Sequence, residues 1–171
     1  MIDAYQVDGK TWFAASFAPP GAAQMQVVGA FLDSDQAADM REGAIKSGHD
    51  YARIDVYFEG GRARMLPVFI RRGKTEIESQ VFDRTAAITA AGVGMSLKDM
   101  HPLAISVFRK DGRSHWLATW DKGPARDFIL ADAGDEIRKR IAAGDLVVDI
   151  DSQAEDNGKV FYYAVVQDRK R

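Results

Sequence analysis

The side chains with the clearest potential for chemistry are the three histidines, His49, His101 and His115. A neutral imidazole can act as a general base or bind a metal ion when a carboxylate orients it. Asp50 follows His49 directly, and Asp99 stands two residues before His101. No third ligand accompanies them at a suitable spacing, so polar residues at the start of a strand are the favoured interpretation. The sequence therefore predicts no catalytic residue and no metal site.

A second group consists of flat aromatic and basic side chains that recur at one position, three residues after a glycine. Its members are Trp12, Arg64, His115 and Phe161. If neighbouring hairpins pair, these side chains form a row at one end of a sheet, where they could grip a sugar, a peptide or a nucleobase. The same face continues with Ala14, Leu66, Leu117 and Tyr163, a pattern that favours core covered by helices. The row is the candidate ligand-binding site.

The strongest basic cluster surrounds the second member of this row. It comprises Arg62, Arg64, Arg71, Arg72 and Lys74. Such a cluster could contact phosphates or an acidic partner, and Arg62, Arg71 and Arg72 join the row as candidate ligand-binding residues. Glu76 and Glu78 follow at once, which favours a solvated sheet edge protected against aggregation.

Four glycine-containing dipeptides supply the framework that would position these side chains. They are Asp8-Gly9, Gly60-Gly61, Asp111-Gly112 and Asn157-Gly158. All four favour the two-residue type I′ hairpin turn, and they recur about every 50 residues. The fourth, sixth and eighth residues after each glycine alternate large, small and large on one strand face. The chain therefore carries an internal repeat of four hairpins.

The segments before the turns repeat as well. Three of them begin with isoleucine, at Ile2, Ile54 and Ile105, each seven residues before its glycine. The fourth begins at Val148, three residues further out, which predicts an insertion in the last hairpin loop.

Between the hairpins, three helices are predicted from their caps and apolar faces. Asp33, Asp83 and Asp132 are the expected N-caps, and Gly48 and Gly144 are the expected stops. The inward faces are expected to carry Ala37, Met40 and Ala44, then Ile88, Ala91 and Met95, then Ile137 and Ile141. Gly92-Val93-Gly94 falls late in the second helix and lacks the remaining glycine of a phosphate loop. A short apolar segment precedes each helix, at Met25 to Leu32, Ile77 to Phe82 and Phe128 to Ala131.

These patterns predict an α+β fold. Four β-hairpins form a largely antiparallel sheet that is covered on both faces or curves toward a barrel, with three helices inserted at intervals of about 50 residues. At 171 residues the chain is most simply one repeat domain, 1–171. Its units are approximately 1–32 (partial), 33–82, 83–131 and 132–171.

Composition excludes several classes of protein. There is no cysteine, so disulfides, thiolate catalysis and sulfur-ligated zinc are excluded. The net charge of −2 gives no broad attraction to nucleic acid or to an anionic membrane. No apolar run reaches the ~20 residues of a membrane span, and the start of the chain has no signal-peptide pattern. A soluble protein is indicated, cytoplasmic as the sequence is written, with the periplasm fitting equally well.

The last unit, from Asp132 to Gly144 and on through Leu146-Val-Val-Asp-Ile150 to Asn157-Gly-Lys-Val-Phe-Tyr-Tyr-Ala-Val-Val166, resembles one unit of the bacterial tandem repeat domain. That family's repeat runs helix, glycine, strand, Gly-containing turn and a strand with a small–small–aromatic ending. Ser34 to Ile70 and Thr85 to Trp120 resemble it too, and Ile2 to Phe17 resembles the hairpin without its helix. The Gly-Tyr pair that opens the family's strand is replaced here by Gly48-His49-Asp50-Tyr51, Met100-His101-Pro102 and Gly144-Asp145-Leu146.

The resemblance implies a non-catalytic accessory or binding region. Relatives carry such arrays beside hydrolase domains that resemble serine β-lactamases, and no Ser-x-x-Lys nucleophile motif occurs in this sequence. The leading prediction is a non-enzymatic binding module that recognises a protein or polymeric ligand and uses no cofactor. Two alternatives stay open, a small hydrolase that uses the histidines with neighbouring aspartates and a stand-alone protein inhibitor.

Overall fold

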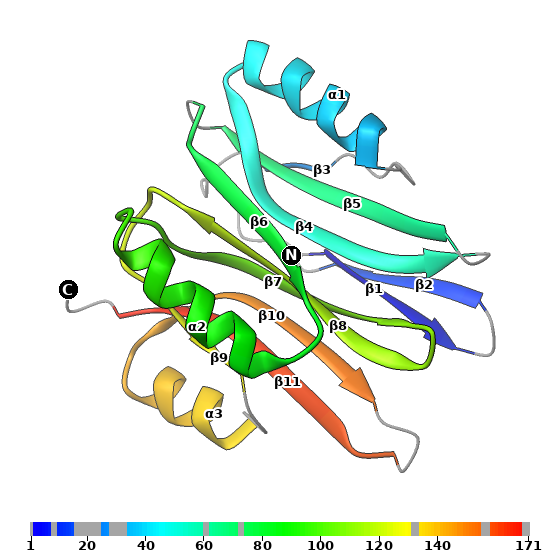
Figure 1. The fold of residues 1–171 in the computed structure, drawn as a ribbon, viewed down its shortest axis with the longest axis vertical. Helices are drawn as coiled ribbons and strands as arrows, with labels where there is room; N and C mark the ends of the chain where they lie inside the picture. The colour runs from blue at the N-terminus through cyan, green and yellow to red at the C-terminus, as the bar shows by residue number, and fades with distance from the viewer. Residues whose placement is uncertain are drawn as a thin grey trace. The chain divides into compact units, whose positions relative to one another are not determined.

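The computed structural model describes residues 2–7, 10–15, 25–27, 34–59, 62–71, 74–130, 134–154 and 158–168. Helices and antiparallel strands are mixed along the chain, which confirms the α+β class (Figure 1). The chain divides into two compact parts, an N-terminal half, Met1–Thr75, and a C-terminal half, Glu76–Arg171. The prediction that residues 1–171 form one repeat domain stays a prediction.

The N-terminal half contains one helix and five strands within the described residues. The elements are β1 (Ile2–Val7), β2 (Lys10–Ala15), β3 (Met25–Val27), α1 (Ser34–Lys46), β4 (His49–Glu59) and β5 (Arg62–Arg71). β1 pairs antiparallel with β2, and a separate sheet has the order β3-β5-β4.

The C-terminal half uses the same kind of unit twice. Its elements are β6 (Ile77–Phe82), α2 (Thr85–Ser96), β7 (His101–Lys110), β8 (Arg113–Asp121), β9 (Asp127–Ile129), α3 (Gly134–Ala142), β10 (Leu146–Ala154) and β11 (Val160–Gln167). One sheet has the order β6-β8-β7, and the other has the order β10-β11-β9.

The expectation of one sheet curving toward a barrel is wrong, because no sheet in the described ranges closes on itself. The physical reason is that β5, β8 and β11 already have both edges paired. Each lies between the first strand of its own hairpin and the short strand that precedes the helix. This pairing groups a short strand with the helix and hairpin after it, whereas the sequence-based units 33–82 and 83–131 grouped it with the hairpin before it.

The three helix-to-strand connections share two backbone details. A residue with positive φ follows each helix, at Gly48, Asp99 and Gly144. Four residues later the pairing of the next strand shifts by one residue, between Tyr51 and Arg53, Pro102 and Ala104, and Val147 and Asp149. A bulge of this kind bends the strand and fixes its register. Because Gly48 and Gly144 have positive φ, they end α1 and α3, as the sequence predicts.

The pairing also corrects the alignment of the last pair of strands with the other three. An isoleucine lies opposite the small residue in every hairpin, as Ile2↔Ala15, Ile54↔Pro67, Ile105↔Ala118 and Ile150↔Ala164. By this register the equivalent of Ile2, Ile54 and Ile105 in the last pair of strands is Ile150, not Val148, and Ile150 stands eight residues before Gly158 instead of seven. Val148-Asp149 and Ile150-Asp151 have the same alternating pattern, and only the bulge at Val148 separates them.

The helix caps and faces agree with the sequence in part. Arg84, with an extended backbone, is the N-cap residue of α2 and makes no side-chain cap, so the expectation for Asp83 is wrong. Asp33 and Asp132 lie outside the described residues. Ala37, Ile88 and Ile137 are buried as expected, but Ile141 is 55% exposed because α3 contacts the sheet chiefly through Ile137.

Carboxylates join the two hairpins of the C-terminal half. The backbone N–H of Ile105 donates to Asp149 Oδ2 (2.9 Å), and the N–H of Val107 donates to Asp151 Oδ2 (2.7 Å). Both aspartates are buried. A carboxylate that accepts a backbone N–H makes a charge-assisted hydrogen bond, which is stronger than a neutral one. The first strands of the two hairpins, β7 and β10, are thus held side by side through side chains.

None of the helices in the described part of the chain combines the length and the apolar character that crossing a membrane requires.

Candidate ligand-binding site beside helix α2

A cavity of about 270 Å³, open to solvent, lies beside α2 in the C-terminal half. The helix supplies one set of lining residues, Ile88, Thr89, Gly92, Val93 and Ser96. The strands and the segment before β9 supply Pro102, Trp120, Arg126, Asp127, Phe128 and Leu130. The walls are thus mainly apolar, with a few polar groups, which is the usual make-up of a small-ligand site.

Two lining residues bury hydrogen-bond donors that have no acceptor among the described atoms. These donors are the indole Nε1–H of Trp120 and the guanidinium Nε–H of Arg126. Trp120 is fully buried, and edge-on contacts with Phe82 and Phe128 fix its ring at centroid distances of 6.0 and 5.6 Å. A buried donor without an acceptor costs about 1–3 kcal/mol. Both donor atoms have almost no solvent-exposed surface, so they lie within the wall of the cavity.

A buried ion pair holds Arg126 in the wall of the cavity. Its Nη1 donates to Asp121 Oδ1 (2.9 Å) and to the carbonyl oxygen of Pro102 (2.9 Å). The side chain of Arg126 is 7% exposed and that of Asp121 is fully buried. Gly123 packs against the pair, because a Cβ there would lie 2.7 Å from Asp121 Oδ1. The guanidinium is therefore fixed before any ligand arrives, which lowers the entropic cost of binding.

The cavity depends on a glycine in α2. The residue seven places before the positive-φ position is Arg41 in α1, Gly92 in α2 and Ile137 in α3. Arg41 reaches across to β4, and Ile137 packs onto Ala164 and Val166 of β11. A Cβ placed on Gly92 would meet no atom within 4 Å. The missing side chain at Gly92 therefore leaves space that the other two units fill.

This geometry predicts opposite stability effects for three glycine-to-alanine changes in the same half. Gly92→Ala and Gly94→Ala should each raise the free energy of unfolding by about 0.5–1 kcal/mol, because alanine is the better helix former and neither Cβ meets another atom within 4 Å. Gly144→Ala should lower it by about 1 kcal/mol, because φ is +94° there. Urea unfolding of the three variants checks the signs. A loss of stability in Gly92→Ala would contradict the open space at this position.

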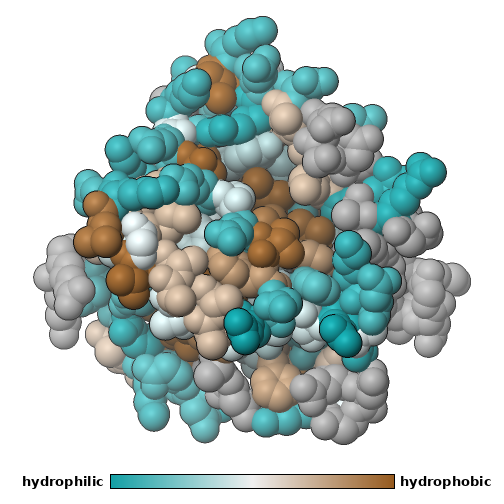
Figure 2. Space-filling model, viewed as in Figure 1, coloured by the Kyte–Doolittle hydropathy of each residue, from teal (hydrophilic) through white to brown (hydrophobic). Residues whose placement is uncertain are grey.

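The outer surface of α2 differs from that of the other helices. Its sequence, TAAITAAGVGMS, contains no charged residue, whereas α1 and α3 carry several. Figure 2 shows brown, tan and white residues over the part of the surface where α2 lies in Figure 1. Val93 is 65% exposed, and Leu97, directly after the helix, is 87% exposed. Uncharged surface thus adjoins the cavity.

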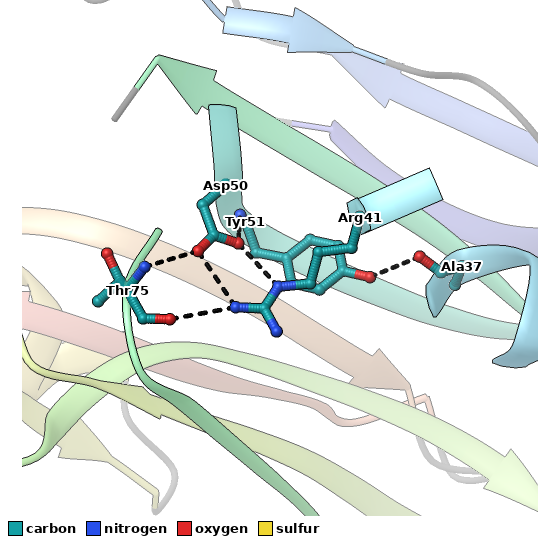
Figure 3. Close-up of polar contacts among 5 residues, drawn as sticks. All are labelled: Ala37, Arg41, Asp50, Tyr51 and Thr75. Carbon is teal, nitrogen blue, oxygen red and sulfur yellow. Dashed lines mark hydrogen bonds and ion pairs between the residues drawn. The ribbon is translucent and has the colours of Figure 1, made fainter. Parts of the chain in front are cut away.

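A second polar cluster lies in the N-terminal half, between α1 and the start of β4 (Figure 3). Asp50 is fully buried and accepts hydrogen bonds from Arg41 Nε (2.8 Å) and Nη2 (3.1 Å) and from the backbone N–H groups of Thr75 (2.9 Å) and Tyr51 (2.8 Å). Arg41 also donates to the carbonyl oxygen of Thr75 (3.1 Å), and the hydroxyl of Tyr51 donates to that of Ala37 (2.8 Å).

The pKa shifts in this cluster follow from its contacts. Burial alone would raise the pKa of Asp50, but the Arg41 guanidinium and the two backbone N–H groups outweigh it and hold the pKa below its ordinary value. The hydrogen bond to Asp50 raises the pKa of Arg41, and burial raises the pKa of Tyr51. The hydrogen bonds to Asp50 thus link α1, β4 and Thr75. We interpret this cluster as structural.

The row proposed from the sequence does not come together in one hydrogen-bonded sheet. Trp12, Arg64, His115 and Phe161 lie on β2, β5, β8 and β11, which belong to four different sheets. His115 stacks on Phe108 across the hairpin, with ring centroids 5.7 Å apart, and Lys159 lies over the ring of Phe161. Arg62 and Arg71 are exposed, Arg72 lies outside the described residues, and for Trp12 only the backbone is described. The ligand-binding role of these residues stays a prediction.

The histidines are not gathered into a catalytic group. The Nδ1 of His49 lies 3.0 Å from the carbonyl oxygen of Ser47, while the neighbouring carboxylate of Asp50 is occupied by Arg41. His101 Nε2 lies 3.6 Å from Asp99, whose side chain is 91% exposed. Among the residues that the structure describes, no three His, Asp or Glu side chains are placed to hold a metal ion.

The residues that line the cavity were not identified from the sequence as a site. In the sequence Trp120 is the eighth residue after Gly112, a large position of the strand pattern, and Arg126 lies in a loop without any motif. The signal that could have found them is Gly92, because it stands where α1 has Arg41 and α3 has Ile137.

No known protein family, curated protein or solved structure matches this chain.

Proposed function

We propose that this protein is a non-enzymatic binding module built from α/β-hairpin repeats, and that the cavity beside α2 receives part of a protein or polymeric ligand. The observation that carries the proposal is the cavity itself, with mainly apolar walls. Its lining suits recognition, since neither the indole of Trp120 nor the guanidinium of Arg126, held by Asp121, attacks a substrate or takes up its proton.

The repeat part of the proposal is supported by backbone details. The positive-φ residue after the helix, the bulge four residues later and the isoleucine opposite a small residue recur in three segments. Three such coincidences favour copies of one βαββ unit, with the β1–β2 hairpin as a partial copy. On this view the resemblance to the bacterial tandem repeat domain extends over the chain. The copies differ at Arg41, Gly92 and Ile137, and the glycine of the middle copy borders the cavity.

The experiment that tests the proposal is a pull-down with the full chain and four variants. Gly92→Ile fills the cavity with the side chain that α3 carries at the same position, and Gly94→Ile is the matched control because Gly94 does not line the cavity. Arg64→Ala and Trp12→Ala test the row of side chains predicted from the sequence. We expect the wild-type protein and the Gly94→Ile variant to capture the same ligand, and Gly92→Ile to lose about tenfold or more in affinity.

The variants separate the possible sites. Equal binding by wild-type and Gly92→Ile protein would rule out the cavity as the binding site. Loss on Arg64→Ala or Trp12→Ala with Gly92→Ile unaffected would move the site to the row instead.

A further inference from the structure

We infer that the carboxylate of Asp55 attaches the β1–β2 hairpin to β4 by accepting a hydrogen bond from the backbone N–H of Ala4, and that the hairpin stays folded only while this attachment holds. Three features of the N-terminal half support this role. They are the register of its strands, the hydrogen bond that orients Asp55 and the small size of the hairpin. The role is independent of where a ligand binds.

The strand register gives Asp55 and Ala4 the places that Asp151 and Val107 have in the C-terminal half. Equivalent positions in the four hairpins are marked by the isoleucines that lie opposite a small residue, Ile2, Ile54, Ile105 and Ile150. Asp55 and Asp151 each follow such an isoleucine directly. Ala4 and Val107 each stand two residues after one. β1 contacts β4 as β7 contacts β10 (Figure 1), so the same pair of positions can meet in both halves.

Asp55 is oriented in the same way as Asp151. Its Oδ1 accepts a hydrogen bond from the N–H of the next residue, Val56 (2.9 Å). Oδ1 of Asp151 likewise accepts one from Ser152 (2.6 Å), while its Oδ2 accepts the N–H of Val107 on the neighbouring strand (2.7 Å). Both aspartates are buried, at 1% and 4% exposed. The shared orientation assigns Oδ2 of Asp55 the same task toward β1, where it makes a charge-assisted hydrogen bond.

The second carboxylate of the C-terminal half has no counterpart in β4. The residue before the marking isoleucine is Asp149 in β10 and Arg53 in β4. Asp149 Oδ2 accepts the backbone N–H of Ile105 (2.9 Å), whereas a guanidinium has only donors and cannot accept an N–H. The attachment of β1 to β4 therefore uses one carboxylate where that of β7 to β10 uses two.

The small size of the β1–β2 hairpin makes it depend on this attachment. β1 and β2 form a two-stranded sheet, whereas each of the other sheets in the described ranges has three strands. A two-stranded hairpin by itself is at best marginally stable in water. Loss of the attachment should therefore unfold β1 and β2 and leave the β3-β5-β4 sheet in place. Release would also displace Trp12, a candidate ligand-binding residue on β2.

The hydrogen bond can be tested by NMR spectroscopy of the full-length protein labelled with ¹³C and ¹⁵N. A hydrogen bond from an amide to a carboxylate produces a scalar coupling between the amide nitrogen and the carboxylate carbon. We expect this coupling between Ala4 and Asp55 in the wild-type protein. The coupling between Val107 and Asp151 is the positive control. Absence of the first coupling while the second is present would rule out the bond.

The dependence of the hairpin on the bond is tested with Asp55→Ser. A buried serine fits this position, since Ser106 occupies it in β7, but its single short oxygen cannot serve the amides of both Val56 and Ala4. The backbone order parameters of β1 and β2 should fall from about 0.85 to below about 0.6, while those of β4 and β5 stay near 0.85. Asp151→Ser is the matched control and should leave β1 and β2 unchanged.

Each other outcome contradicts a stated part. Low order parameters for β1 and β2 in the wild-type protein would show that the hairpin is not attached. Unchanged order parameters in Asp55→Ser would show that the hairpin does not depend on Asp55. Equal loss of order in β4 and β5 would show that the hairpin does not unfold separately. If Asp55→Ser fails to fold, separate unfolding is also contradicted, and the wild-type coupling still decides the hydrogen bond.

Discussion

Replacement of Arg126 by alanine is expected to destabilise the C-terminal half by about 3–5 kcal/mol. The side chain of Asp121 is fully buried, and the change removes the guanidinium that pairs with it at 2.9 Å. The carbonyl oxygen of Pro102 also loses its hydrogen bond from Nη1. Chemical denaturation followed by tryptophan fluorescence measures the loss, because Trp116 and Trp120 both lie in the core of this half.

Two further variants make that measurement specific. Arg126→Lys keeps a positive charge near Asp121 and should cost clearly less than Arg126→Ala. Arg138→Ala breaks a pair with Asp135 in which the side chains are 75% and 82% exposed, and exposed pairs contribute under about 1 kcal/mol. If Arg126→Ala costs no more than Arg138→Ala, the buried pair does not stabilise the wall of the cavity.

Replacement of Asp50 by asparagine is expected to cost the N-terminal half about 3 kcal/mol or more near neutral pH. The carboxylate accepts hydrogen bonds from Arg41, Thr75 and Tyr51, and an amide in its place turns an NH₂ group toward some of these donors. Asp39→Asn, on the exposed side of α1, is the matched control and should have almost no effect. Urea unfolding of both variants gives the comparison.

The loss in free energy of unfolding on Asp50→Asn should also become smaller as the pH falls. The pKa of Asp50 in the folded protein is below its ordinary value of 3.8, so the folded state binds this proton less readily than the unfolded chain does. The stability that the carboxylate provides is therefore complete above about pH 5 and is lost as pH falls through the lowered pKa. The difference between wild-type and Asp50→Asn protein should shrink on acidification. A difference that grows toward low pH would show that the sign is wrong.

Much of the local structure could be predicted because it depends on neighbouring residues. Gly48 and Gly144 end their helices through positive φ, which glycine adopts without strain. Ile88 and Ile137 are buried where the helical period places them. The exact register of the last hairpin could not be obtained in this way. Val148-Asp149 and Ile150-Asp151 fit the alternation equally well, and the bulge that separates them depends on pairing with β11.

The candidate site could not be predicted, because it depends on how distant elements pack. Gly92, Trp120 and Arg126 come from a helix, a strand and a loop, and no spacing in the sequence relates them. The strands that carry Trp12, Arg64, His115 and Phe161 do not share one sheet for a similar reason. The short strands β3, β6 and β9 occupy the strand edges through which neighbouring hairpins would have paired. Asp50 looked like a partner for His49, but Arg41 on α1 takes its carboxylate instead.

The hydrogen bonds to the carboxylates of Asp149 and Asp151 allow separation of β10 from β7 to be detected by itself. They are the acceptors of the Ile105 and Val107 amides, so these amides stay protected from solvent hydrogen exchange only while β10 remains beside β7. Separation of β10 from β7 would expose them even if the β6-β8-β7 sheet stayed intact. Their exchange therefore reports a local opening of the β10–β11 strand pair, with a free energy below that of global unfolding.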